Sequence, residues 1–349
     1  MIAKENYEEA HIRDLQDKSH RDPGLIERTL YAFGLLEALV QVGMPFIFKG
    51  GTSLLLLLDK PMRLSTDIDI VVGPGTDVEH YIEKAADIFP FSAQEEQIRR
   101  GKNDMEKRHF RFTYLSPILQ KPFYILLDVL YENNNYARLV TKEISNDILL
   151  SEGDALKVQI PSIDCILGDK LTAFAPHTTG VPLNANKDME IMKQFYDICT
   201  LLDVFSNFDD VKSTYTKVID TEIQYRGGNL SPEDALRDTI SSAIAIGARG
   251  NLAPEDYPSY VRGARDVRTH IYAETYSPEI AAERSPGVAY LSACILSDSN
   301  CERIDIFDNL LNEPLKHPDI KELKYLKKIS PEGYAYAVKT DKILMDLYE

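Results

Sequence analysis

Two acids and two glycines that stand close together in this sequence have the types and spacing to carry chemistry. Asp67 and Asp69 open an apolar run, residues 67–72, that is typical of a buried strand. Side chains two apart on a strand share a face, so we expect the two carboxylates to point the same way. Neighbouring carboxylates repel each other unless one is protonated or a cation bridges them. Hard oxygen ligands of this kind suit Mg²⁺ or Mn²⁺.

Gly50 and Gly51 precede these acids and lie between an apolar lead-in, residues 46–48, and an apolar helix-like segment, residues 54–58. Paired glycines before a helix let the backbone approach a ligand closely and aim N–H groups at an anion. An anion-binding turn beside a divalent-metal acid pair is what phosphoryl or nucleotidyl transfer requires. A Gly-Gly pair is often only a turn, and an Asp-x-Asp only a solvated loop. The apolar strand that follows the acids favours the functional interpretation.

The order of these residues resembles the nucleotidyltransferase AbiEii/AbiGii toxin family, a branch of the polymerase-β-like nucleotidyltransferases. The resemblance rests on Gly-Gly-Thr-Ser, a short helix, and Arg-x-Ser-x-Asp-x-Asp. It implies an enzyme that uses Mg²⁺ (or Mn²⁺) to move a nucleotide from an NTP to an acceptor hydroxyl, with tRNA as the suggested acceptor and a cognate antitoxin as partner. Asp67 and Asp69 would hold the metal. The nucleotide-binding residues would be Lys49, Gly50, Gly51, Thr52, Ser53, Arg63 and Ser65.

Asp128 is an anomaly inside a second apolar run, residues 122–131, which is suited to a central strand. A charge there is costly unless it is paired or bound to a cation. It could instead end the strand and cap the next turn. The resemblance implies a third metal position on a neighbouring strand, where the Asp128 carboxylate would also help to activate the attacking hydroxyl. A third strand, residues 108–114, alternates with period two and places Phe110, Phe112 and Tyr114 on one face.

Lys170 lies on the inward apolar stripe of a predicted helix, residues 163–174. Either its stem passes the core to reach water, or its ammonium holds the triphosphate, as the Asp169-Lys170 pair implies by its similarity to the family. In the next helix, residues 187–205, Lys193 and Asp197 are expected opposite the buried face, where they would form a surface ion pair. The resemblance instead assigns Asp197 to the active site, although Gln194 departs from the family pattern.

The bulk properties are those of an ordinary soluble protein of 349 residues with a net charge of −16. The acidic balance argues against a general nucleic-acid binder, but it permits a local basic patch or a small nucleotide. Residues 1–15 lack the apolar core of a signal peptide, and no stretch has the length of a membrane span, so we expect a cytoplasmic protein without membrane contact. None of the four cysteines has metal-ligand spacing, and Cys165 and Cys199 are expected to be buried thiols.

The predicted fold is α/β (α+β). Residues 1–160 would form a polymerase-β-like nucleotidyltransferase core with a small mixed sheet, and residues 161–349 a mainly helical domain that completes the cleft. Three amphipathic segments, residues 231–246, 279–297 and 305–311, follow in the second part.

Three other functions stay open at this point. The chain could be a nucleotide-sensing or interaction module without turnover, although the complete set of acids argues against that. The acceptor could be a protein rather than tRNA. A metal-dependent phosphohydrolase would need an activated water, and the sequence offers no His/Asp cluster to supply one.

Overall fold

The computed structural model describes residues 1–97 and 107–348, and the chain divides into two compact units. The N-terminal unit comprises Met1–Ser162 and Thr269–Glu274. The C-terminal unit comprises Ile163–Arg268 and Thr275–Glu349.

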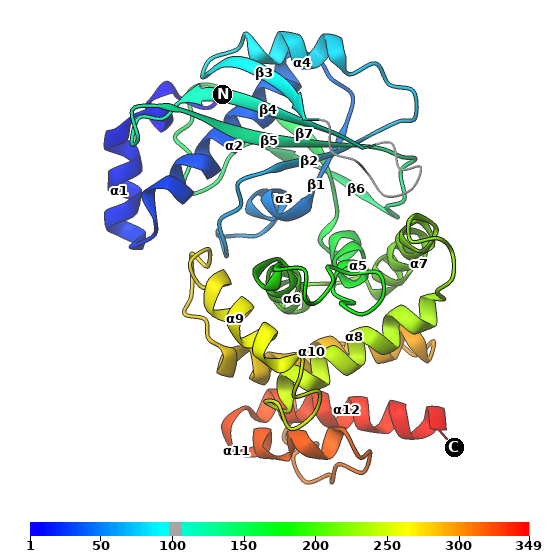
Figure 1. Cartoon of the computed structure of the whole chain (residues 1–349). Coiled ribbons are helices and arrows are strands. Elements are labelled where there is room, and N and C mark those ends of the chain that lie inside the picture. The colour runs from blue at the N-terminus through cyan, green and yellow to red at the C-terminus, as the bar shows by residue number, and fades with distance from the viewer. Residues whose placement is uncertain (98–106, 349) are drawn as a thin grey trace. The chain divides into compact units, whose positions relative to one another are not determined.

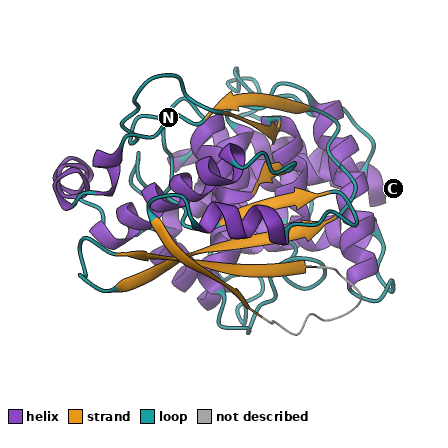
Figure 2. Cartoon of the chain, turned by 90° about the horizontal axis from the view of Figure 1, so that it is seen from above, coloured by secondary structure: helices purple, strands orange, loops and turns teal. Residues whose placement is uncertain are grey.

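A mixed sheet forms the centre of the N-terminal unit. Its strands, in spatial order among the described residues, are β1 (Ile47–Lys49), β2 (Ile68–Val72), β5 (Pro122–Tyr131), β4 (Lys107–Leu115) and β3 (Phe91–Gln97). Strands β2 and β5 are parallel and the other pairs are antiparallel (Figure 1). The strands fan out rather than lie flat (Figure 2), as the right-handed twist of β-structure requires. The apolar run predicted as a central strand is β5, in the middle of this sheet.

The two faces of the sheet differ in character. Phe110, Phe112 and Tyr114 of β4 are buried on one face, as their spacing predicts. Helix α2 (Pro23–Gln41) covers this face: the ring of Tyr31 stacks on Tyr114 with centroids 3.7 Å apart. Because successive side chains on a strand alternate, His109 of β4 and its partner Asp128 of β5 point to the opposite face.

Smaller elements complete the N-terminal unit. They are η1 (Lys4–Tyr7), α1 (Glu9–Ser19), α3 (Gly50–Leu57), α4 (Glu79–Ala86) and the antiparallel pair β6 (Leu139–Glu143) and β7 (Lys157–Pro161). Helix α3 begins at Gly50, so the paired glycines form its first turn instead of preceding it. Strand β2 begins at Ile68, directly after Asp67.

The C-terminal unit contains helices and no strand within its described residues. The helices are α5 (Ile163–Ala173), α6 (Asp188–Leu202), α7 (Phe208–Tyr225), α8 (Pro232–Gly247), α9 (Tyr257–Val267), α10 (Pro278–Leu296), η2 (Ile320–Tyr325), α11 (Leu326–Ile329) and α12 (Pro331–Tyr348). Helix α10 packs against α6, α8 and α12. The predicted small mixed sheet and the predicted helical second half are both confirmed.

Two of the three amphipathic segments form helices, namely α8 and α10, and the third does not. Residues 305–311 form a turn-containing loop, and Ile306 is 81% exposed. Its other apolar residues, Phe307, Leu310 and Leu311, are only half-buried, so the segment lacks much of the packing that stabilises helices in proteins. Cys165 and Cys199 are buried free thiols, as predicted. Within residues 1–97 and 107–348, no helix combines the length and the apolar character that crossing a bilayer demands.

Candidate active site

Four polar residues form a row across neighbouring strands of the sheet. Lys49 of β1 is in register with Asp69 of β2, Asp69 with Asp128 of β5, and Asp128 with His109 of β4. Directly paired residues on adjacent strands project from the same face. This charged row (Lys49, Asp69, Asp128 and His109) therefore lies on the face opposite α2, and it brings together two acids that are 59 positions apart in the chain.

Asp69 carries the strongest electrostatic signal in the row. Burial and the nearby carboxylates of Asp128 and Asp67 together raise the pKa of its carboxyl to about 6, against the opposing effects of Lys107 and Lys49. A carboxyl group whose charge is opposed by two other acids sits in a concentration of negative potential. The structure thus gathers the three predicted acids around one position.

Asp67 contributes from the loop that precedes β2, where its side chain is exposed. Thr66 Oγ1 donates to its Oδ1 at 3.4 Å, and Thr52 Oγ1 donates to its backbone carbonyl at 2.6 Å. The second bond ties the first turn of α3 to the start of β2. It holds the glycine turn and the acids in a fixed relation.

Both carboxylate oxygens of Asp128 have partners on β4. His109 Nδ1 lies 2.6 Å from Oδ1, and Lys107 Nζ lies 3.2 Å from Oδ2. Burial alone would raise the pKa of Asp128, but Lys107 and His109 outweigh it and lower that pKa. Asp128 lies within β5 and does not end the strand, so the interpretation as a strand-end cap is wrong.

Sequence reasoning missed Lys107 and His109. The period-two pattern of residues 108–114 already placed His109 on the face opposite the three aromatic rings. What it did not contain was the pairing of β4 with β5, which sets His109 beside Asp128.

The glycine turn lies directly against the acids. Gly50 has a φ of +79°, a conformation that favours glycine, and a Cβ atom at this position would overlap the carboxylate of Asp69. A Cβ on Gly51 would meet the end of the Arg63 side chain and, at 3.0 Å, the Ser65 hydroxyl. The structure therefore brings Gly50, Gly51, Arg63, Ser65 and Asp69 close together.

Arg63 is held by the segment that returns from later in the chain. Its backbone forms a β-bridge with Ile271, and the Leu64 N–H donates to the carbonyl of His270 at 2.8 Å. The Arg63 side chain is 6% exposed and donates from Nη1 to the Leu64 carbonyl at 3.2 Å. A buried guanidinium is a fixed positive charge next to the turn at Gly51.

The hydroxyls of the turn point into the protein. Thr52 donates to the Asp67 carbonyl, and Ser53 Oγ donates to the carbonyl of Gly50 at 2.8 Å. Both side chains are buried. A contribution of Thr52 and Ser53 to anion binding would therefore use backbone N–H groups and not hydroxyls.

Lys49, the residue before the turn, places its Nζ 5.7 Å from the ring centroid of Tyr136.

Lys170 and Asp197, the two predicted site residues of the C-terminal unit, pair with each other. Lys170 Nζ lies 2.9 Å from Asp197 Oδ2 and 2.9 Å from Gln194 Oε1. Asp197 is 1% exposed, so its predicted position on the outer face of the helix is wrong. The reason is that the second half of α6 is buried on all sides, from Phe195 to Leu202. Lys170 does lie inward, as predicted.

The donor set of the charged row fits a hard divalent cation, since carboxylate oxygens are the ligands that Mg²⁺ and Mn²⁺ prefer. The raised pKa of Asp69 points the same way, because a cation would relieve the repulsion that raises it. Among the residues that the structure describes, no group of three or more His, Cys, Asp or Glu side chains is already arranged to hold a metal. Both oxygens of Asp128 are instead directed to Lys107 and His109.

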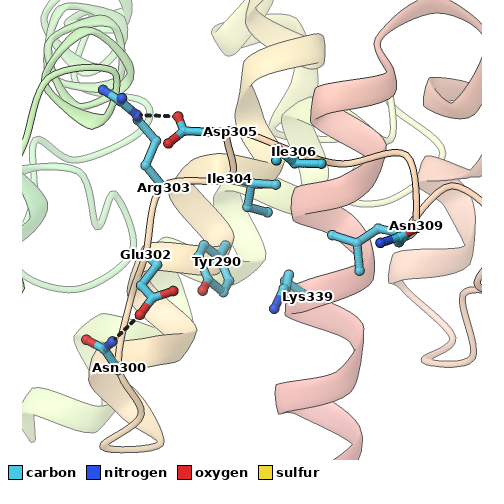
Figure 3. Close-up of a pocket in the computed structure, with 10 residues that line it drawn as sticks. Tyr290, Asn300, Glu302, Arg303, Ile304, Asp305, Ile306, Asn309 and Lys339 are labelled. Carbon is cyan, nitrogen blue, oxygen red and sulfur yellow. Dashed lines mark hydrogen bonds and ion pairs between the residues drawn. The ribbon is translucent and has the colours of Figure 1, made fainter.

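A pocket of about 640 Å³ in the C-terminal unit contains none of the predicted site residues. It is lined by Tyr290 of α10, Lys339 of α12 and the loop between them (Figure 3). Its polar groups largely satisfy one another: Arg303 Nε donates to Asp305 at 3.0 Å, and Asn300 donates to Glu302 at 2.9 Å. We assign it no part in the chemistry of the charged row.

Exchanging the first glycine of the turn should be far more damaging than exchanging the second. Gly50→Ala places a side chain in a left-handed conformation and against Asp69, at a cost of roughly 1–3 kcal/mol from backbone strain alone. Gly51→Ala serves as the matched control because it adds the same methyl group, against Arg63 and Ser65 Oγ, without requiring a left-handed backbone conformation. Urea unfolding of both variants measures the difference. Equal stabilities would contradict the placement of Gly50 against Asp69.

Asp69→Asn should stabilise the metal-free protein in a pH-dependent way. The folded-state pKa of about 6 exceeds the ordinary value of 3.8, so ionised Asp69 opposes folding above pH 6, and this cost disappears below pH 3.8. With a chelator at pH 8 the variant should gain about 2–3 kcal/mol, and the gain should shrink as the pH falls toward 4. Denaturant unfolding across this range provides the measurement. A gain in stability that does not depend on pH would show that the pKa of Asp69 is not raised in the folded protein.

Comparison with known proteins agrees with the family that the sequence resembles. The model of the family "Nucleotidyl transferase AbiEii toxin, Type IV TA system" matches residues 34–268, about two thirds of the chain. Two solved structures from Helicobacter pylori are similar, JHP933 and a protein named provisionally as a nucleotidyltransferase. Each is 13% identical with a TM-score of 0.43, and the matches cover 78% of this chain and 93% and 96% of the two others.

A search of proteins with curated function found no match. The family match includes both glycines of the turn, the three acids of the N-terminal unit, Lys170 and Asp197. The chain therefore belongs to the AbiEii nucleotidyl transferase toxin family of type IV toxin–antitoxin systems, and it is a nucleotidyltransferase.

Proposed function

We propose that this enzyme transfers a nucleotide from an NTP to an acceptor hydroxyl, with tRNA as the acceptor, and that the N-terminal unit carries the reaction. The observation that supports this most is the register of Asp69 with Asp128, next to the glycine turn at the start of α3. Family membership implies a nucleotide substrate and an antitoxin partner. We place the enzyme in the cytoplasm, where NTPs and tRNA are available.

The polyphosphate would bind at the turn. Backbone N–H groups at the first turn of α3 can face phosphate oxygens, and Gly50 and Gly51 leave room for that approach. Arg63 would offset the negative charge from a fixed, buried position, with Ser65 beside it and Lys49 at the end of the row. Thr52 and Ser53 would keep the turn in shape through their bonds to the backbone.

The three acids would hold Mg²⁺ or Mn²⁺. A bound divalent ion supplies charge neutralisation at the phosphate oxygens during transfer. Asp69 and Asp67 would face the phosphates, since the Asp67 carboxylate acts on Asp69 and helps to raise its pKa. Asp128, kept ionised by its neighbours, would accept the proton of the attacking hydroxyl.

Transfer of label from α-³²P-labelled NTPs to total tRNA tests the proposal. Asp69→Asn and Asp128→Asn should each reduce transfer by roughly 100-fold or more, because each removes a carboxylate from the proposed metal site. Asp87→Asn, an exposed acid at the end of α4, is the control and should retain full activity. Label on a protein and not on tRNA would identify a protein acceptor. Release of free phosphate, or binding without any transfer, would overturn the proposed reaction.

A double substitution separates the structural and catalytic contributions of the buried pair in the C-terminal unit. Lys170→Met or Asp197→Asn alone removes the charged partner of a buried ionised group, which should cost roughly 3–5 kcal/mol of stability. Combining them removes both charges and should restore most of that loss. If Lys170 also acts on the nucleotide, as the family resemblance predicts, the restored double variant should remain inactive. Recovery of transfer together with stability would make the pair purely structural.

A further inference from the structure

Asp128 already has a cation beside it, supplied by the chain itself. The ammonium of Lys107 lies 3.2 Å from Oδ2 of Asp128, and Lys107 is also the cation that most stabilises the charged form of Asp69, since it lowers the pKa of Asp69 more than Lys49 does. One lysine therefore acts on both acids of the charged row. That is the position in which a bound divalent ion would act.

Lys107 reaches this position because of the pleat of β4. Lys107 and His109 are two residues apart, so they share the face that carries the charged row. His109 stands directly opposite Asp128, and Lys107 stands one diagonal step away. Arg108, between them, points to the other face and binds Glu79 and Glu96, each at 2.7 Å.

The two partners of Asp128 differ in how easily they can leave. His109 is 8% exposed, has a short side chain and lies 2.6 Å from Oδ1. The Lys107 side chain is 36% exposed and ends a flexible stem, so its ammonium can move into water at little cost. Oδ1 is therefore the fixed oxygen of Asp128, and Oδ2 is the exchangeable one.

We propose that Lys107 is an internal cation that occupies the acid site in the metal-free enzyme and that a divalent metal ion must displace it from Asp128. The inference rests on the proposed function, because it takes Asp69 and Asp128 as metal ligands. In this arrangement Lys107 holds the repelling acids together before the metal arrives, and it lowers the affinity for the metal alone. His109 is a positioning residue that keeps Oδ1 turned away while Oδ2 changes partner.

An ordinary surface ion pair would not behave in this way. Exposed pairs contribute little, because water screens both charges. The Asp128 side chain, however, is only 20% exposed, and it adjoins Asp69, whose charge is already unfavourable. Loss of the Lys107 charge should therefore destabilise the charged forms of two partly buried acids, Asp69 and Asp128.

Mn²⁺ binding to the nucleotide-free, full-length protein tests the inference without relying on activity. Lys107→Met should bind Mn²⁺ roughly tenfold more tightly or better, because a unit charge a few ångströms from a divalent ion is removed. Lys107→Arg keeps the charge and should stay close to wild type. Lys157→Met removes the same charge from an ion pair between Lys157 of β7 and Glu143 of β6 and should leave the affinity unchanged. Titration followed by the electron paramagnetic resonance of free Mn²⁺ gives the dissociation constants.

Thermal unfolding gives a second measurement, which also shows whether a variant is folded. In chelator, Lys107→Met and Lys107→Gln should melt below wild type, because the acids lose their cation, and saturating Mn²⁺ should raise their melting temperatures more than that of wild type. Unchanged or weaker Mn²⁺ binding in both variants would overturn the role of Lys107.

Asp69→Asn distinguishes this failure from failure of the proposed function. Suppose that Asp69→Asn loses the Mn²⁺ binding seen in wild type, while Lys107→Met binds Mn²⁺ as wild type does. The acids are then supported as the metal site, and the proposed role of Lys107 is wrong. If Asp69→Asn and Lys107→Met both bind Mn²⁺ as wild type does, or if the wild type itself binds no Mn²⁺, the acids are not the metal site and both proposals fall.

Discussion

The electrostatic repulsion between Asp69 and Asp128 is the constraint on which the rest of the N-terminal unit depends. Parallel pairing of β2 and β5 sets the two acids side by side on a partly buried face, where water screens their charges poorly. Such an arrangement is stable only if positive charge is brought to it. The residues around the two acids provide that positive charge.

Both neighbouring strands, β1 and β4, contribute basic side chains next to the acids. Strand β1 ends at Lys49, in register with Asp69, and β4 presents Lys107 and His109 to Asp128. The turn that follows β1 approaches Asp69 so closely that its first residue must be glycine. The same close approach places the first turn of α3 next to the acids. One geometric feature therefore serves both the stability of the charged row and the proposed binding of polyphosphate.

Buried charge is handled differently in the C-terminal unit. Lys170 and Asp197 neutralise each other between two helices, with Gln194 as a further partner of the ammonium. An internal pair of this kind needs no ligand to be satisfied, whereas the charged row contains acids that oppose one another. This difference in charge balance is why the N-terminal unit carries our proposal for the chemistry.

Local patterns in the sequence determined the elements and the family. The alternation of Phe110, Phe112 and Tyr114 predicted β4, the apolar run around Asp128 predicted β5, and Gly50 to Asp69 was enough to indicate a nucleotidyltransferase. Each of these patterns lies within a short stretch of sequence, so it can be recognised without knowledge of the fold. Segments with weaker local patterns were less predictable: residues 305–311 form no helix, and none of their apolar side chains is fully buried.

Only the tertiary structure decided which side chains meet. The pairing of β4 with β5 gave His109 and Lys107 to Asp128, and the packing around α6 turned Asp197 from an expected surface residue into the buried partner of Lys170. Strand register and helix burial are set by the whole core, which no single stretch encodes. The residues able to do chemistry could therefore be read from the sequence, while the charges that control them became visible only in the folded chain.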